Sequence, residues 1–421
     1  MRTFRHRVSE RGFSLVELLV AMLIGLIGMI IIFQVFQVSE GIKRSTTSGG
    51  DAQQNGVIAL YSIERDFKNA GMGFNDTGFA GCNIIGYDSQ RATPNFPPAG
   101  VTMKLAPVLI TSGAATTAPD QVSVLYGSQS QAATVTLAAD MGSPTDDVFV
   151  TTPFGYNPGD VLVLNEPNSG KNCSVMEFNR TGASSNQLKH DNASYLSGPT
   201  PRFNAPGGLG VFYAGVGTLN VSRVFNLGNL YTLPPGGTAP IYLPVYNFYA
   251  IANGSLTVTS QFLIDNGQPA VTSVADNIVH MRALYGLDDG NNDATVPYNV
   301  TPTAGDGIVD RYVDAATFNA LLALVPPPVP TPWARLVSVR IALVSRSALP
   351  EKPSSGKLSD PCDATTAEPQ WTGTPWAGAP FNYQTRLDVS SSVAAPDDWK
   401  CYRYRVFETT IPLRNWIWKA S

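Results

Sequence analysis

Few side chains in this sequence could perform catalysis. Its 421 residues include only three histidines, His6, His190 and His280. The HExxH, GxSxG and phosphate-binding-loop spacings do not occur. No serine or cysteine can be matched with a neighbouring base, so the residues that could do chemistry predict a protein that is not an enzyme.

An acidic stretch late in the chain has the spacing of metal ligands. Asp289, Asn291 and Asp293 occupy alternate positions, as oxygen ligands do in calcium loops. Asp306 and Asp310 could add carboxylates if the chain folds back. An EF-hand would need a glutamate at its twelfth position and a glycine at its sixth, and neither is in place, while such clusters also form plain turns. We keep these five residues as a candidate structural calcium site and expect no other cofactor.

The four cysteines indicate disulfides. Cys82, Cys173, Cys362 and Cys401 are dispersed, and none forms a CxxC pair that would suggest zinc or thioredoxin chemistry. An even number in an exported chain is typical of two disulfides, for which three pairings exist. Proximity favours Cys82–Cys173 and Cys362–Cys401, and four buried free thiols are the alternative.

Glu17 is the only charged residue in the apolar run of residues 13–38, FSLVELLVAMLIGLIGMIIIFQVFQV. An ionised carboxylate at membrane depth costs roughly 3 kcal/mol on insertion scales, so such a residue tends to mark a function. The element that carries Glu17 must therefore be considered first.

That element is long enough to cross a membrane. Its 26 residues extend about 39 Å as a helix, more than the hydrocarbon core requires. The preceding residues 1–12 carry four arginines against the single acid Glu10, which predicts a cytoplasmic leader. No small-residue cleavage site follows the run, unlike an ordinary secretory signal. Everything after residue 38 should lie outside the cytoplasm.

A second helical stretch, residues 51–74, follows a break or bend that we expect at Gly49–Gly50. Asp51 is its expected N-cap and Gly71 its expected stop. An apolar face at helical spacing should pack on a sheet; it comprises Leu60, Ile63, Phe67 and Ala70.

The remaining residues, 75–421, are predicted to form a β-rich head. The sequence does not decide whether this head has one lobe or two. Strands are predicted at residues 121–127, 133–139, 160–166, 174–180, 218–227, 240–251, 255–264, 277–287, 334–347 and 404–414. Residues 325–333 should form an extended connector and residues 354–374 a loop. Only 14% of residues are charged, Gly and Pro number 70 (38 + 32), and the net charge is −4. This composition suits an extracellular protein that binds no nucleic acid.

The stretch RGFSLVELL resembles the class III signal of type IV pilins and pseudopilins. The resemblance implies that a prepilin peptidase cleaves between Gly12 and Phe13 and that the new Phe13 amine is N-methylated. In an assembled helix bundle this ammonium would be buried and would need a partner. Glu17 of a neighbouring subunit, about one helical turn away, could form the ion pair. The alternative is that the helix is only a membrane anchor and that the Glu17 side chain extends to the membrane interface.

Several later stretches resemble the PilW-type minor pilins. They are YSIERDFKNAGMG (residues 61–73), NIVHMRALYGLD (277–288), GDGIVDRYVDA (305–315), WARLVSVRIALVSRS (333–347) and YRVFETTIPLRN (404–415). Residues 289–304 separate two motifs that are nearly adjacent in the family. The resemblance implies an α+β, type IV pilin-like fold, in which a long N-terminal membrane-spanning and assembly helix, residues 13–74, packs on a large antiparallel head.

The resemblance further implies a subunit that primes pilus assembly near the tip and supports motility and adhesion. Its partners would be other minor pilins and the major pilin through the N-terminal helix, the prepilin peptidase, the inner-membrane assembly platform and a tip adhesin. The protein would cross the inner membrane once, with its head in the periplasm, and would then enter the extracellular fibre. The alternatives are a type II secretion pseudopilin of the J type and a membrane-anchored periplasmic enzyme or binding protein.

Overall fold

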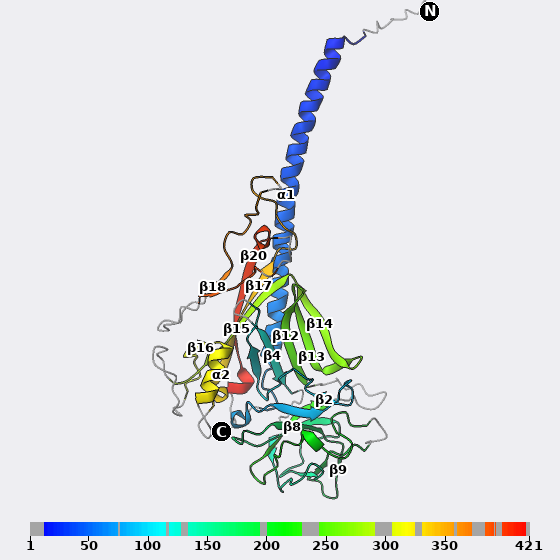
Figure 1. Ribbon diagram of the computed structural model, residues 1–421, viewed down its shortest axis with the longest axis vertical. Helices are drawn as coiled ribbons and strands as arrows, with labels where there is room; N and C mark the ends of the chain where they lie inside the picture. The colour runs from blue at the N-terminus through cyan, green and yellow to red at the C-terminus, as the bar shows by residue number, and fades with distance from the viewer. Residues whose placement is uncertain are drawn as a thin grey trace, which may run out of the picture.

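A computed structural model of the chain describes residues 12–74, 76–114, 118–127, 134–193, 200–229, 244–290, 305–324, 331–357, 360–372, 384–390, 392 and 398–417. Its longest element is the helix α1, Leu15–Phe67, with 53 residues. The N-terminal half of α1 projects from the head, and its C-terminal half is embedded in it (Figure 1). This arrangement is the predicted α+β, pilin-like layout.

Of the break or bend expected at Gly49–Gly50, the break is wrong, since α1 runs through both glycines and through Asp51 without interruption. Each glycine costs about 1 kcal/mol in a helix interior. Tertiary packing on both sides of the pair, at Ser48 and Ala52, which are buried, outweighs that cost because most helical stability in proteins comes from such packing. The helix ends at Phe67, earlier than the expected stop at Gly71.

Two antiparallel sheets surround the embedded half of α1, which packs on β14, β17 and β20. The five-stranded sheet has the order β14 (Gln268–Asp276), β13 (Ser255–Asp265), β12 (Val245–Ala252), β4 (Gln121–Tyr126) and β3 (Val108–Thr111). The four-stranded sheet has the order β16 (Arg311–Val313), β15 (Ile278–Leu287), β17 (Leu336–Arg346) and β20 (Tyr404–Pro412).

A second pair of sheets lies at the end of the head farthest from the projecting helix (Figure 1). The six-stranded sheet has the order β2 (Asn95–Phe96), β1 (Ile84–Tyr87), β8 (Cys173–Glu177), β7 (Asp160–Asn165), β11 (Arg223–Asn229) and β5 (Thr134–Thr136), with only β1 and β8 parallel. The three-stranded sheet comprises β6 (Val148–Phe149), β10 (Gln187–Lys189) and β9 (Arg180–Thr181). We call these two sheets the distal lobe.

Alternation along β7 connects the distal lobe to the rest of the head. Val161 and Val163 belong to the main core with α1, whereas Leu162 and Leu164 belong to a separate core beneath the three-stranded sheet. Because successive side chains of a strand point to opposite faces, one strand serves two cores.

Smaller elements complete the described chain. They are α2 (Ala315–Leu324), α3 (Arg414–Ile417), the 3-10 turns Thr77–Phe79, Gly210–Phe212, Pro332–Arg335 and Trp399–Cys401, and the hairpin of β18 (Gln370–Thr372) and β19 (Gln384–Arg386). The hairpin corrects the expectation of loop alone over residues 354–374. In the expected connector, residues 325–330 lie outside the described residues, and Pro332 begins a 3-10 turn.

Candidate functional site

The N-terminal half of α1 is the first candidate, because nothing in the head covers it. Its most apolar window has a mean hydropathy of 2.8 and none of it is buried within the chain. By length and composition this is the one membrane-length helix among the described residues. So much exposed apolar surface must be covered by lipid or by other helices.

A capping box closes the N-terminus of α1 and fixes the geometry of Glu17. The backbone N–H of Glu17 donates to Ser14 Oγ at 3.2 Å, and the backbone N–H of Ser14 donates to Glu17 Oε2 at 3.1 Å. The two side chains thus satisfy two helix-end donors reciprocally. The carboxylate is held beside the first turn, where the helix dipole favours negative charge.

Gly12 and Phe13 lie before the capping box, outside the helix, and both are exposed. The Phe13 side chain is 88% exposed, and no atom lies within 4 Å of where a Cβ on Gly12 would be. A peptidase could therefore reach the bond between them. An amine freed at Phe13 would lie next to Ser14, whose own N–H contacts the Glu17 carboxylate. Cleavage, methylation and the Glu17 ion pair stay predictions.

A stripe of small residues seats the other half of α1 on β17 and β20. Ser48, Ala52, Gly56 and Ala59 are buried at helical spacing, and the Ser345 hydroxyl donates to the Ala52 carbonyl at 2.7 Å. A Cβ on Gly56 would come within 2.1 Å of the Phe407 ring. Close contact between the helix and the sheet therefore requires glycine at this position.

Asp66 fixes the end of α1 in the five-stranded sheet. Its buried carboxylate accepts hydrogen bonds from Tyr249 Oη at 2.6 Å, Asn247 Nδ2 at 2.8 Å and Tyr126 Oη at 3.4 Å. Burial and the Asp66 charge raise the pKa of Tyr249. Sequence reasoning missed both Gly56 and Asp66. The one available signal for Asp66 was its place between Ile63 and Phe67, two residues of the apolar face of the helix.

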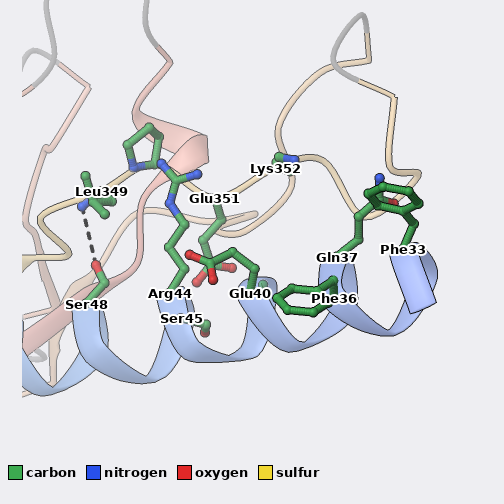
Figure 2. Close-up of a pocket in the computed structure, with 12 residues that line it drawn as sticks. Phe33, Phe36, Gln37, Glu40, Arg44, Ser45, Ser48, Leu349, Glu351 and Lys352 are labelled. Carbon is green, nitrogen blue, oxygen red and sulfur yellow. Dashed lines mark hydrogen bonds between the residues drawn. The ribbon is translucent and has the colours of Figure 1, made fainter. Parts of the chain in front are cut away.

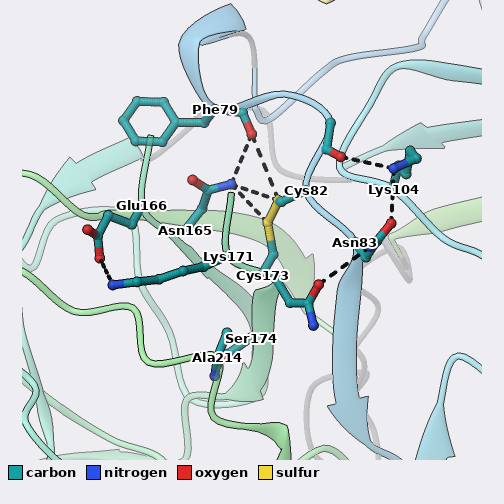
Figure 3. The surroundings of a disulfide bond; sticks show 12 residues. Phe79, Cys82, Asn83, Lys104, Asn165, Glu166, Lys171, Cys173, Ser174 and Ala214 are labelled. Carbon is teal, nitrogen blue, oxygen red and sulfur yellow. Dashed lines mark hydrogen bonds and ion pairs between the residues drawn. A yellow bond between two sulfur atoms is a disulfide. The ribbon is translucent and has the colours of Figure 1, made fainter. Parts of the chain in front are cut away.

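Two disulfides brace the head. Cys82 bonds Cys173 and Cys362 bonds Cys401, with Cα–Cα distances of 5.7 and 4.8 Å, which is the pairing that proximity favoured. The first ties the segment after α1 to β8, and Asn165 Nδ2 beside it donates to the Phe79 carbonyl at 2.9 Å (Figure 3). The second ties a loop to the residues that precede β20.

The acidic stretch folds partly as expected. Asp310 Oδ2 accepts from the backbone N–H groups of Asp289 and Gly290, each at 2.8 Å, and Asp289 pairs with Arg311 at 2.7 Å. Burial, helped by the carboxyls of Asp289 and Asp288, raises the pKa of Asp310 to about 6.

Asp306, another described member of the calcium set, accepts from the Ile308 N–H at 2.9 Å in a local turn. Asn291 and Asp293 lie outside the described residues. Within the described ranges, no three His, Cys, Asp or Glu side chains gather as metal ligands. The calcium site therefore stays a prediction.

The described histidines give no sign of a reactive centre. His280 is buried inside β15. His190 is buried just after β10, with its Nε2 2.8 Å from the Asp146 carbonyl. His6 lies outside the described residues.

Comparisons with known proteins match two segments of the chain. Residues 7–33 match the family model described as the prokaryotic N-terminal methylation motif. Residues 248–415 match the family described as Type IV Pilus-assembly protein W. No curated protein and no solved structure matches the chain. The second match begins in β12 and ends in α3, so it covers the four-stranded sheet and the strands β12 to β14 of the five-stranded sheet. It leaves β3, β4 and the distal lobe unmatched.

Proposed function

The chain is a PilW-type minor pilin of a type IV pilus, and on that premise we propose that it primes pilus assembly and lies near the pilus tip. Residues 13–74 act as the packing segment and residues 75–421 as the head. The observation that carries this proposal is the membrane-length half of α1, which is left bare by the head. A single chain cannot bury this surface, so it has to be shared with lipid first and with sister helices later.

The proposed life of the protein begins in the inner membrane. The leader, residues 1–12, stays in the cytoplasm, the head faces the periplasm, and the prepilin peptidase cuts between Gly12 and Phe13. The new α-amine is largely protonated near neutral pH, and methylation keeps it basic. The inner-membrane assembly platform then moves the protein into the fibre.

In the fibre the Phe13 ammonium of one subunit meets Glu17 of its neighbour. The capping box supports this proposal because it holds the carboxylate at the helix end instead of letting it extend into lipid. A buried charge that lacks a partner costs several kcal/mol. The pair therefore selects a stagger of about one helical turn between adjacent subunits.

A tip position is supported by the size of the head. Its 347 residues (421 − 74) include the distal lobe, which extends away from the helix (Figure 1). Such a bulk is hard to repeat along a tightly packed fibre. Sister minor pilins and the major pilin would contact α1, and a tip adhesin would contact the distal lobe. No catalytic step and no nucleic-acid binding belong to this proposal.

Peptide mass spectrometry of a sheared pilus fraction tests the proposal. We expect a mature N-terminus that begins at methylated Phe13, and we expect Gly12→Leu to retain residues 1–12 and to leave the protein in the membrane fraction. The matched control, Gly25→Leu, lies inside the helix, where a Cβ meets no atom within 4 Å, and should still be cleaved. Wild-type protein that retains its leader in the fibre would contradict the proposal.

A further inference from the structure

A pocket of about 440 Å³ lies between α1 and the segment of residues 349–352, where the helix enters the head (Figure 2). Phe33 and Phe36 line it toward the N-terminus of α1. Glu40 and Arg44 line it farther along the helix, and Lys352 stands over α1 from the loop. The pocket is therefore apolar at one end and charged at the other.

The loop wall of this pocket is fixed in place. The Leu349 N–H donates to Ser48 Oγ at 3.4 Å, and Glu351 accepts from Arg403 Nε and Nη2 at 2.5 and 2.9 Å. The Cys362–Cys401 disulfide closes the loop behind them. One contact joins the loop to the helix and two join it to the residues before β20, so the pocket is preformed.

The position of the pocket along α1 sets its depth in a membrane. Its ammonium would place Phe13 at the inner headgroups, and at about 1.5 Å per residue Phe33 lies about 30 Å farther, near the outer end of the hydrocarbon core. Glu40 and Arg44 lie about 40 and 46 Å beyond Phe13, at the outer edge of a bilayer that is about 40–45 Å thick with its headgroups. The apolar end therefore faces acyl chains and the charged end faces headgroups, in the same order as in the outer leaflet.

The charges in the pocket point to the chemistry of its occupant. Within the described residues neither Arg44 nor Lys352 forms a hydrogen bond or an ion pair. Glu351, one of the two carboxylates in the lining, already pairs with Arg403. Two cations above an apolar floor then match a phosphodiester that carries acyl chains. The Glu40 carboxylate at the same end could pair with the ammonium of a lipid headgroup. A protein helix would fill the apolar floor but would pair with both cations only if it carried acidic side chains at matching positions.

We propose that this pocket binds one phospholipid from the outer leaflet of the inner membrane before the protein enters the fibre. The acyl chains lie along Phe33 and Phe36, and Arg44 and Lys352 hold the phosphate. The inference concerns the membrane stage alone, so it goes beyond the proposed role in assembly. It adds a lipid contact that fixes how deep the head rests.

Photo-crosslinking of the full chain tests the proposal. The protein is placed in vesicles of phosphatidylethanolamine that contain a diazirine-bearing phosphatidylethanolamine, illuminated, and mapped by peptide mass spectrometry. We expect cross-links at residues 33–44 and 349–352. The double variant Arg44→Gln/Lys352→Gln should lower their yield about tenfold or more, since each phosphate contact is charge-assisted.

The matched control is Lys43→Gln/Lys357→Gln, which removes the same charge from the same helix and the same loop outside the pocket. Its yield should equal that of the wild type. Gly41→Phe gives a second test, because Gly41 lines the pocket and a Cβ there meets no atom within 4 Å. It should fill the pocket and abolish the cross-links without changing the thermal unfolding of the head.

Any of the following results would overturn the proposal: equal yields from the pocket and control double variants, full competition by inorganic phosphate, or cross-links only to a second pilin chain. Leader cleavage and fibre entry are scored on the same samples. Normal leader cleavage and fibre entry without a lipid cross-link would refute the lipid site and leave the assembly role intact. A retained leader with an intact lipid cross-link would refute the assembly role and leave the lipid site intact.

Discussion

At the N-terminus of α1 one carboxylate carries two roles that can be separated. In the single chain Glu17 caps the helix through Ser14, and in the fibre we propose that it pairs with a neighbouring ammonium. A neutral amide can form a capping box but cannot form an ion pair. The charge and the cap can therefore be removed one at a time.

We predict that Glu17→Gln inserts in the membrane normally but enters fibres poorly, because it keeps the cap and loses the charge. Ser14→Ala loses the cap, at about 1 kcal/mol of helix stability, and keeps the charge, so it should enter fibres nearly as well as the wild type. Immunoblots of sheared fibres against membrane fractions measure both. Normal entry of Glu17→Gln would remove the ion pair from the account.

Asp310 should give the head an unusual pH dependence. A carboxyl whose pKa is raised by folding, here to about 6, holds its proton in the folded state between about pH 4 and pH 6. The free energy of unfolding contributed by this group therefore falls as the pH rises through that window.

The comparison with Asp310→Asn isolates this contribution from the other carboxylates of the head, since an amide oxygen can still accept the two backbone hydrogen bonds. Denaturant titrations in chelator should show the wild type losing stability relative to Asp310→Asn from about pH 4 to pH 6. A constant difference between the two proteins across that range would contradict the assignment.

The sequence makes Glu17 conspicuous and hides Asp66, for a physical reason. Glu17 is alone in an apolar run, so its neighbours along the chain already identify it. Asp66 gains its role from Asn247 and Tyr249, more than 180 residues later. No local pattern specifies which distant strand brings a donor to a carboxylate.

At the scale of elements, the contact between α1 and β20 depends on small side chains. Gly56 packs directly against the Phe407 ring. The preceding Gly50 lies on the same helix, with no atom within 4 Å of its Cβ position. The two glycines lie in the same helix but only Gly56 faces another side chain, so Gly50 serves as the control position for Gly56.

We predict that Gly56→Val destabilises the head by about 1–3 kcal/mol, because the Phe407 ring must move or α1 must lift from the sheet. Gly50→Ala should stabilise the protein by up to about 1 kcal/mol through helix propensity. Thermal and chemical unfolding of the two variants measure the difference. Equal stabilities would show that the helix is not held at Gly56.

Most strands could be predicted because alternation and turn residues mark them. The strands β4, β7, β8, β13, β15, β17 and β20 all fall within or near their expected ranges. The edge strand β14 was missed because it is largely exposed and shows little apolar alternation. The prediction of a helical break at Gly49–Gly50 is wrong because it gave local propensity more weight than the burial of residues on either side.

At the scale of the whole molecule, a buried ionic cluster joins the distal lobe to the five-stranded sheet. Asp88 pairs with Arg202 at 2.7 Å and with Arg91 at 2.8 Å. Arg202 also donates to the Phe262 carbonyl at 2.7 Å, and Arg91 to the Gln261 carbonyl at 2.8 Å. The strand β13, which carries both carbonyls, is thereby fixed to residues beside the six-stranded sheet.

We predict that Arg202→Ala costs about 3–5 kcal/mol, since it leaves the buried Asp88 charge with less compensation. Limited proteolysis should then cut between the distal lobe and the rest. Arg180→Ala, which breaks a half-exposed pair with Asp191, should cost under about 1 kcal/mol. If both variants unfold alike, the cluster does not join the lobe to the sheet.

The sequence was enough to predict the limits of the head along the chain but not the number of its lobes. The continuous apolar run of β7 is typical of a strand buried on both faces, yet it does not say that the two faces belong to different cores. Arg91 and Arg202 are 111 residues apart (202 − 91), and both pair with Asp88. Such meetings depend on topology, which strand patterns alone do not fix.

The seating of α1 along β20 has a mechanical consequence. A fibre under tension pulls this subunit by its N-terminal rod, roughly along the length of the strand beside it (Figure 1). The ladder between β17 and β20, with nine residue pairs in register, would then be strained in shear, so that many bonds resist together instead of breaking in succession. The far end of the head would follow the rod as a rigid tip.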